Sequence, residues 1–340
     1  MSKVITLGEI LMRLSPGNGL RFTQADSFDL YFGGGEYNVA VSLASFGIDT
    51  AFITRLPDND LGKRALMDIR KHGVSDHHIL LGGERLGLYF FEEGSGVRAG
   101  KVIYDRANSA MATLETGIID WKKIFNGAAV FHWSGITPAI SQKAADVCLE
   151  ALKFAHQAGI IISCDLNYRT ALWQYGKEPQ AIMPDLLHYC THILGDIDTA
   201  LFMLGKTKTN PDYSNLKALN DQYQNLFTLC PHLKQMATTL RYSLHASHQQ
   251  IGGIWCDQSN IYQSKIRDIT PVVDRIGTGD AFMSGWLYGL LQESFDEQHT
   301  LDFAVAACCL KHTVKGDINL VSVSEIEELL NGNDSAKVKR

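Results

Sequence analysis

Two glycines and Asp280 stand close together in the segment 274–282, which reads Asp-Arg-Ile-Gly-Thr-Gly-Asp-Ala-Phe. Apolar residues recur at helical spacing from Phe282 onward, so residues 277–280 are predicted to form the first turn of a helix, and Val272 and Val273 to end a strand before it. The free N–H groups and partial positive charge of such a turn attract anions, and glycine lets the backbone approach phosphate oxygens closely. The segment therefore predicts a phosphate-binding turn.

Asp280 is the acid of this turn, where it would repel a phosphate rather than bind one. Its chemistry fits a general base that takes the proton from a hydroxyl as the hydroxyl attacks a phosphoryl group. Gly277 and Gly279, with Thr278 between them, are the predicted anion-binding groups. A Gly-x-Gly-Asp string is also found in glycine turns capped by an aspartate, so the string alone leaves a purely structural role open.

A second glycine turn, Gly33-Gly34-Gly35-Glu36-Tyr37-Asn38, also precedes a helical pattern. The two turns, and the sequence from Gly8 to about Leu330, resemble the ribokinase-type (PfkB) carbohydrate kinases. Within that family the chain is most similar to the 2-keto-3-deoxygluconate kinases. The collinear strings that carry the likeness are Gly87–Glu92, Tyr104–Ala110, Asp165–Arg169, Thr239–Arg241, Val273–Arg275, Leu310–Thr313 and Gly316–Asp317.

The resemblance implies a set of site residues. Asp280 is the expected base, with Gly277 and Gly279 as the anion hole. The residues expected to contact the sugar are Gly34, Asn38, Tyr89, Tyr104, Arg106 and Arg169. The residues expected to border the nucleotide are Asp196, Arg241, Gly277, Gly279, Lys311 and Asn319.

Two pairs among these residues have specific expected roles. A keto-deoxy sugar acid carries a carboxylate, which the guanidinium groups of Arg106 and Arg169 are suited to bind. An arginine taken alone is more often part of a surface ion pair. Tyr89 and Tyr104 are expected to flank the substrate from a lid, although both also fit a packed strand face.

One departure from the family pattern concerns magnesium. After the strand expected at Cys190–Leu194, relatives carry an asparagine and, three residues later, an acid, whereas this chain has Asp196 and Thr199. Asp196 can still hold water or metal through oxygen, and Asp198 lies beside it. ATP and Mg²⁺ are the expected cofactors, the metal ligands stay unassigned, and a requirement for a monovalent cation stays open.

Two other nucleotide-binding motifs are excluded. Gly205-Lys206-Thr207 looks like the end of a Walker loop, but the position that requires the first glycine is Ala200. The residues before Gly205 read as a short apolar helix that ends at this glycine. The first predicted strand leads into Gly8-Glu9-Ile10 without a Gly-x-Gly-x-x-Gly string, which argues against a dinucleotide enzyme.

Composition restricts the class of protein. The 340 residues are 45% hydrophobic and 20% charged, with a formal net charge of −6, which argues against a nucleic acid as partner. Apolar runs are too short to cross a bilayer. The seven cysteines and the absence of an apolar leader predict reduced thiols and a cytoplasmic location. No cysteine or histidine spacing indicates zinc.

The order of predicted elements indicates an α/β fold with a parallel sheet covered on both faces. Helical patterns separate strands predicted near Val4–Gly8, Ala51–Thr54, Ala129–Trp133, Ile160–Asp165, His192–Gly195 and Met236–Leu240. Ligands of such sheets lie beyond the carboxyl ends of the strands, where Asp165–Arg169 and Asp196 fall.

The resemblance makes this fold a ribokinase-like three-layer sandwich with a mostly parallel central sheet. It adds a small β-sheet lid from residues of about 10–33 and 85–108, and a homo-oligomer, a dimer or higher, that pairs through the lid. The kinase domain is expected over 1–331 and a polar tail over 332–340.

The function expected from motif and resemblance is transfer of the ATP γ-phosphoryl group to the 6-hydroxyl of 2-keto-3-deoxygluconate. A related kinase acting on fructose, ribose or another keto-sugar acid would share fold and base. A non-catalytic sugar or nucleotide sensor is the alternative that Thr199 raises. The sugar's stereochemistry, the nucleotide preference and the oligomeric state stay open.

Overall fold

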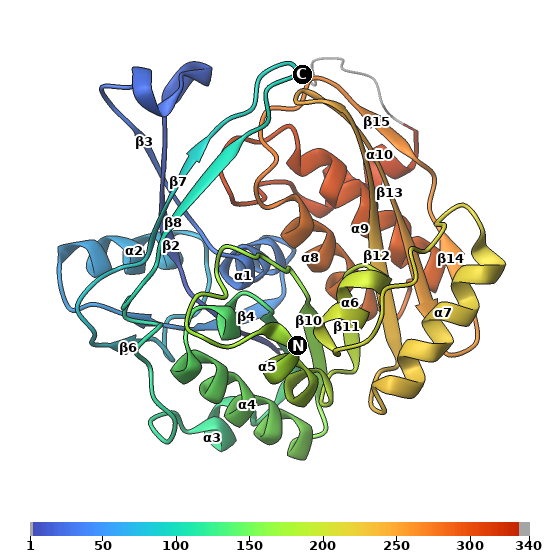
Figure 1. Ribbon diagram of the computed structural model, residues 1–340, viewed down its shortest axis with the longest axis horizontal. Coiled ribbons are helices and arrows are strands. Elements are labelled where there is room, and N and C mark those ends of the chain that lie inside the picture. Colours follow the sequence, from blue (N-terminus) through green and yellow to red (C-terminus); the bar gives the residue numbers. More distant parts are fainter. Residues whose placement is uncertain (1–2, 333–340) are drawn as a thin grey trace.

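The computed structural model describes residues 3–332 of the chain (Figure 1). Its strands are β1 (Lys3–Leu7), β2 (Leu11–Ser15), β3 (Asp29–Gly33), β4 (Asp49–Ile53), β5 (Arg55–Leu56), β6 (Leu80–Leu81), β7 (Leu88–Glu92), β8 (Lys101–Asp105), β9 (Ala128–Ser134), β10 (Ile161–Asp165), β11 (His192–Leu194), β12 (Gln235–His245), β13 (His248–Asp257), β14 (Ile261–Gln263) and β15 (Arg267–Ile269). Its α-helices are α1 (Gly35–Ser45), α2 (Asp60–Lys71), α3 (Trp121–Phe125), α4 (Gln142–Gln157), α5 (Pro179–Leu187), α6 (Ile197–Met203), α7 (Leu216–Leu229), α8 (Thr278–Leu290), α9 (Glu297–Lys311) and α10 (Val323–Leu330).

Within residues 3–332, nine strands form the main sheet. Eight lie in the order β14-β13-β12-β11-β10-β9-β1-β4, and β15 also pairs with β13. The strands from β12 to β4 run parallel, and β13 turns back antiparallel to β12 at the edge. Because parallel strands end at one edge of a sheet, the segments that follow β1, β9, β10 and β11 are brought together there.

Helices cover both faces of this sheet (Figure 1). Helices α3 to α7 pack on one face, and α1, α8, α9 and α10 on the other. Each face of the sheet has its own hydrophobic core, and neighbouring residues of one strand belong to different cores. Val4 of β1 packs with α8 and α9, and Ile5 packs with α3 and α4. This division follows from the alternation of side chains along a strand.

Side-chain caps fix where several helices begin. Asn59, Ser141, Asp196, Asp296 and Ser322 each accept a hydrogen bond from a backbone N–H of the first turn that follows. Such caps satisfy N–H groups that have no partner within the helix. The start of α6 at Asp196 matters for the site, because it places this carboxylate at the end of β11.

A separate four-stranded sheet has the order β3-β2-β7-β8. Its strands come from the two segments predicted to form a lid, about 10–33 and 85–108. The sheet extends to one side of the main body (Figure 1). β2 pairs parallel with β7, while β3 and β8 are its antiparallel edges. The predicted fold class, a mostly parallel sheet between helices with a small additional sheet, is confirmed.

The six predicted strands are all present, and their starts agree with the structure within two residues. β12 is longer than predicted, since it continues to His245 as one arm of a hairpin with β13. The prediction of a strand ending at Val272 and Val273 is wrong. β15 ends at Ile269, and an irregular segment leads to α8, because Val273 and Asp274 instead donate backbone N–H groups to the carbonyl of His312.

Four smaller predictions concern the rest of the chain. All seven cysteines are buried and unpaired. Gly205 follows α6 with φ 69°, which is the helix-ending conformation expected of it. Among the described helices, none has the length and apolar character needed to cross a membrane. The predicted tail 332–340 lies outside the described residues from 333 onward.

Candidate active site

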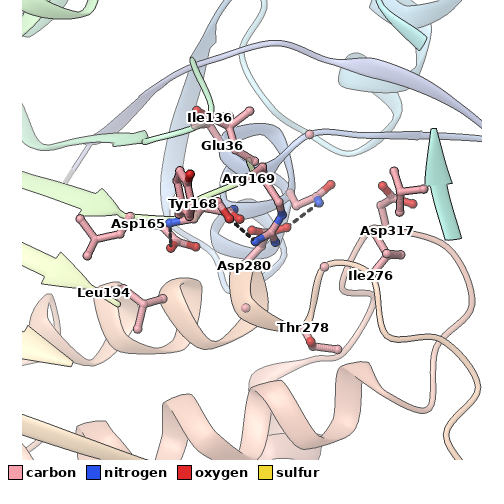
Figure 2. A pocket seen from close by; sticks show the side chains of 18 of the residues that line it. Glu36, Ile136, Asp165, Tyr168, Arg169, Leu194, Ile276, Thr278, Asp280 and Asp317 are labelled. Carbon is pink, nitrogen blue, oxygen red and sulfur yellow. Dashed lines mark hydrogen bonds between the residues drawn. The ribbon is translucent and has the colours of Figure 1, made fainter. Parts of the chain in front are cut away.

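A cavity of about 560 Å³ opens at the carboxyl ends of β1, β9, β10 and β11. All site residues predicted from the sequence line it except Lys311 and Asn319. Figure 2 shows Asp280 near its centre, with Asp165 and Tyr168 on one side and Ile276 and Asp317 on the other. The first turns of α1 and α8 and the loops after four parallel strands therefore share one pocket.

Asp280 is buried in the first turn of α8, and the amide of Asn38 donates a hydrogen bond of 2.7 Å to its Oδ2. Burial raises the pKa of Asp280 to about 7, the hydrogen bond from Asn38 opposes this rise, and the nearby Asp165 adds to it. A carboxylate with a pKa near neutral pH is suited to accept a proton during a reaction. Asn38 therefore orients the candidate base.

The turn before Asp280 has the geometry of an anion site. Gly277 caps α8 in the left-handed region with φ 79°, and a side chain there would collide with the carbonyl oxygen of Asp317. Gly279 has no atom within 4 Å of the place where a Cβ would stand, so its backbone faces open space in the cavity. The free N–H groups of this turn are accordingly accessible to a phosphate.

The two predicted carboxylate-binding arginines differ in their surroundings. Arg106 is buried, and its Nε donates to Glu9 Oε2 over 2.7 Å. Arg169 is exposed, and its Nη1 donates to the carbonyl of Tyr168 over 3.0 Å. Both line the cavity. A guanidinium carries five N–H donors, so each arginine keeps donors beyond these bonds for a ligand.

Tyr89 and Tyr104 come from the small sheet and line the cavity with rings 6.3 Å apart. The hydroxyl of Tyr89 donates to Asp317 Oδ2, so this tyrosine joins the small sheet to the loop behind α8. Tyr104 is half-buried. The ring of Tyr89 rather than its hydroxyl is therefore the part offered to a ligand.

Asp196 and Arg241, two of the residues predicted to border the nucleotide, each form hydrogen bonds with the first turn of a helix. Asp196 accepts from the N–H of Thr199 over 2.8 Å and from its hydroxyl over 2.6 Å. Arg241 Nη2 donates to Thr278 Oγ1 over 2.8 Å, which joins β12 to the glycine turn. Thr199, the residue that departs from the family pattern, thus binds the carboxylate three residues before it.

Lys311 and Asn319, the other two residues predicted to border the nucleotide, do not line the cavity. Lys311 is fully buried, and its Nζ donates to the carbonyls of Val314 and Gly316. Asn319 is buried and accepts from the N–H of Val321. Both side chains turn inward because the loop after α9 folds over them and uses their polar groups.

Glu9 and Glu36 are cavity residues that were not predicted from the sequence. Glu9 follows β1, so the rule that ligands lie beyond strand ends was sufficient to find it, as it was for Asp165 at the end of β10. Burial raises the pKa of Asp165 to about 6. Glu36 accepts from the hydroxyls of Ser134 and Thr137 and fastens α1 to the loop after β9.

A second unpredicted group lies behind the glycine turn. Arg13 of β2 is fully buried and forms ion pairs of 2.9 Å with both Asp274 and Asp317. The carboxylate of Asp274 also accepts the N–H groups of Ile276 and Gly316. Nothing in the local sequence signals this group, because its members come from three distant segments.

Together these residues provide the parts needed for phosphoryl transfer to a hydroxyl: a positioned base, an anion site at a helix start, and cationic groups facing the same cavity. One carboxylate, that of Asp196, is placed to contact the water shell of a nucleotide-bound magnesium ion, and the described residues contain no group of three or more metal-ligating side chains. Asp196 keeps acceptor capacity beyond its two bonds to Thr199, and an ion of this kind keeps several of its waters.

Comparisons with known proteins agree on one family. The model of the pfkB family of carbohydrate kinases matches residues 1–323. A 2-dehydro-3-deoxygalactonokinase of Haloferax volcanii is 30% identical over 335 residues, 98% of either chain. A 2-dehydro-3-deoxygluconokinase of Thermoproteus tenax is 27% identical, covering 97% of this chain and 94% of that protein. The crystal structure of 2-dehydro-3-deoxygluconokinase from Thermotoga maritima has a TM-score of 0.92 at 39% identity and covers 98% of this chain and 100% of that one.

Proposed function

The chain belongs to the pfkB family of carbohydrate kinases, and on that premise we propose that it phosphorylates 2-keto-3-deoxygluconate, also named 2-dehydro-3-deoxygluconate, on its 6-hydroxyl with ATP. The observation that carries this choice of sugar is the pair of arginines in the cavity that contains the base. A neutral sugar offers no carboxylate for Arg106 and Arg169, whereas a keto-deoxy acid does. Relatives named for such acids support the choice.

In the proposed reaction Asp280 accepts the proton of the 6-hydroxyl while the oxygen attacks the γ-phosphorus. The bond from that phosphorus to the β,γ-bridging oxygen breaks, and ADP leaves. The N–H groups at Gly277 and Gly279 stabilise the charge on the transferred phosphoryl oxygens. Asp196 would hold the water shell of a magnesium ion, which would neutralise charge on the nucleotide.

At the sugar end, Arg106 and Arg169 bind the acid's carboxylate. Asn38, whose amide N–H donates to Asp280, accepts a hydrogen bond from a sugar hydroxyl through its side-chain oxygen. Asn38 Oδ1 is buried without a hydrogen-bond partner among the described residues, so a sugar hydroxyl can donate to it. Tyr89 and Tyr104 place the small sheet against the substrate as a lid that excludes water.

The lid is also the proposed contact between subunits of a homodimer. The edge strands β3 and β8 and the turn before β3 expose large apolar side chains, namely Phe28, Leu30, Val102 and Ile103. Exposed apolar groups on edge strands favour pairing with another copy of the sheet. A cytoplasmic location is likewise proposed, since free buried thiols fit a reducing compartment.

The test is ADP release with Mg-ATP and each of four sugars: 2-keto-3-deoxygluconate, its galactonate epimer, fructose and ribose. We expect turnover on the keto acids, with the gluconate preferred. Preference for the galactonate epimer would change the assigned sugar, and preference for fructose would refute the acid specificity. Measurable binding without turnover of any sugar would indicate a sensor.

The Arg106→Ala variant tests how the acid is recognised. Because this change leaves Glu9 buried without its partner, the double variant Glu9→Gln/Arg106→Ala serves as the matched control for the stranded charge. We expect both variants to raise KM for the keto acid by about 10- to 100-fold, as loss of a charge-assisted bond does. An unchanged KM in the double variant would show that Arg106 does not bind the carboxylate.

A further inference from the structure

Lys311, the last residue of α9, is a fully buried lysine next to the phosphate turn. Its Nζ donates to the carbonyl oxygens of Val314 over 2.9 Å and Gly316 over 2.8 Å. A lysine is almost never fully buried unless its charge is paired. The two carbonyl oxygens are therefore part of what compensates the buried ammonium.

The ionisable groups around Lys311 are mainly acidic. Asp274 and Asp317 both attract its ammonium, Asp280 adds to this attraction, and Arg13, which pairs with Asp274 and Asp317, opposes it. Tyr89 also donates to Asp317. Removal of Lys311 would leave Arg13 as the buried cation beside Asp274 and Asp317.

This cluster touches the turn that carries the anion site. Lys311 Cε lies 3.3 Å from the place where a Cβ of Gly277 would stand. Asp274 Oδ1 accepts the N–H of Ile276, and its Oδ2 accepts the N–H of Gly316. The ammonium therefore lies directly behind the turn, and Lys311 itself does not line the cavity.

We propose that Lys311 acts as a built-in monovalent cation that positions the Gly277–Gly279 turn for phosphoryl transfer. Two carbonyl oxygens and neighbouring carboxylates are the surroundings that an alkali ion prefers, and an ammonium carries the same charge. Since Lys311 occupies these oxygens, they do not fit a separate alkali ion. The enzyme accordingly works without added potassium or sodium. This inference rests on the proposed kinase reaction but not on the identity of the sugar.

The experiment compares the wild-type enzyme and the Lys311→Met variant in potassium, ammonium and choline chloride at equal ionic strength. We expect the wild-type kcat to be the same in all three salts. Lys311→Met should lose about tenfold or more of kcat in choline chloride, with the sugar KM nearly unchanged, because a fixed charge behind the anion site is lost. Potassium or ammonium should restore part of that loss.

The Lys315→Met variant is the matched control. Lys315 lies four residues after Lys311, in the loop that follows α9, but it is exposed and pairs with Glu93 over 3.5 Å. The same change of charge there should leave kcat and its salt response unchanged. A loss in Lys315→Met equal to that in Lys311→Met would mean that the effect is not specific to the buried position of Lys311, and would overturn the proposal.

Thermal melting keeps the test decisive if Lys311→Met folds poorly. We expect potassium to raise the melting temperature of Lys311→Met above its value in choline, and to leave the wild type unchanged. A wild-type kcat that requires potassium, or a Lys311→Met variant with full kcat in choline, would overturn the proposal. If the wild type prefers another sugar, the same comparison is run with that sugar, so failure of the proposed substrate is seen separately.

Discussion

The two walls of the cavity are built differently. The wall at the start of α8 is closed from behind, since Asp280 is buried, Gly277 leaves no room for a side chain, and Asp274 is paired with Arg13. The wall at the strand ends is open, with Arg169 exposed and Thr199 half-buried. Contacts within the protein thus hold Asp280 and the glycine turn in place, whereas we expect the ligands themselves to complete the opposite wall.

The largest effect is expected from Asp280→Asn, which removes the base and keeps its shape. A positioned base contributes about 10²- to 10⁴-fold to a rate, so kcat should fall by that factor while both KM values change little. The carbonyl of the new amide can still accept from Asn38, so the melting temperature should stay near that of the wild type. Steady-state kinetics and thermal melting test this. A variant with more than a tenth of the wild-type kcat would remove Asp280 from the base role.

Next in size is the difference between Gly277→Ala and Gly279→Ala. At Gly277 the left-handed φ of 79° and the nearby carbonyl of Asp317 oppose a methyl group, so alanine should cost about 1–3 kcal/mol of stability and about 10²- to 10³-fold in kcat. At Gly279 the methyl group meets no protein atom, so stability should be unchanged while kcat falls because the methyl group occupies phosphate space. Equal losses of melting temperature in both variants would contradict this account of the turn.

The two walls also differ in how much of each could be predicted from the sequence. The groups at the turn and at the strand ends follow local rules: glycines before a helical pattern, and polar residues after a buried strand, as at Asp280 and Asp196. The closure behind the turn follows no local rule. Arg13 and Asp317 meet only because two loops and a strand of the small sheet converge in space.

Lys311 shows that the position of a residue in the sequence does not reveal whether its side chain faces the cavity. Its sequence neighbours suggest a cation at the nucleotide, and burial of its side chain becomes visible only when the loop over 314–317 is folded. The fold was easier to predict from the sequence than the surroundings of Lys311. Alternating strands and helices specify a covered parallel sheet, whereas the antiparallel edge formed by β13 depends on a hairpin whose strand pattern continues past the predicted end of β12.

A pH profile of kcat tests whether the hydrogen bond from Asn38 lowers the pKa of Asp280. Because the pKa of Asp280 is raised to about 7, the carboxyl is protonated below that pH and cannot accept a proton, so kcat should fall as pH drops through 7. The hydrogen bond from Asn38 favours the charged carboxylate, so Asn38→Leu should move this fall to higher pH, by about one unit. The profile is measured at saturating sugar, because Asn38 is also a proposed sugar contact. A profile that shifts to lower pH would contradict the role of the bond.

The smallest effect is expected at the open wall, from Thr199→Val. The change keeps the shape of the side chain and the bond from the Thr199 N–H, and it removes only the hydroxyl bond to Asp196, at a cost of about 1 kcal/mol. Since the proposed magnesium reaches this wall through water and substrate phosphates, kcat should stay within about threefold of the wild type. Asp196→Ala is the companion variant, because it removes the helix cap and the acceptor together and should raise the Mg²⁺ concentration needed for half-maximal rate. If Thr199→Val lowered kcat as far as Asp280→Asn, the strand-end wall would take part in the chemistry, and the distinction between a fixed wall and a wall completed by ligands would fail.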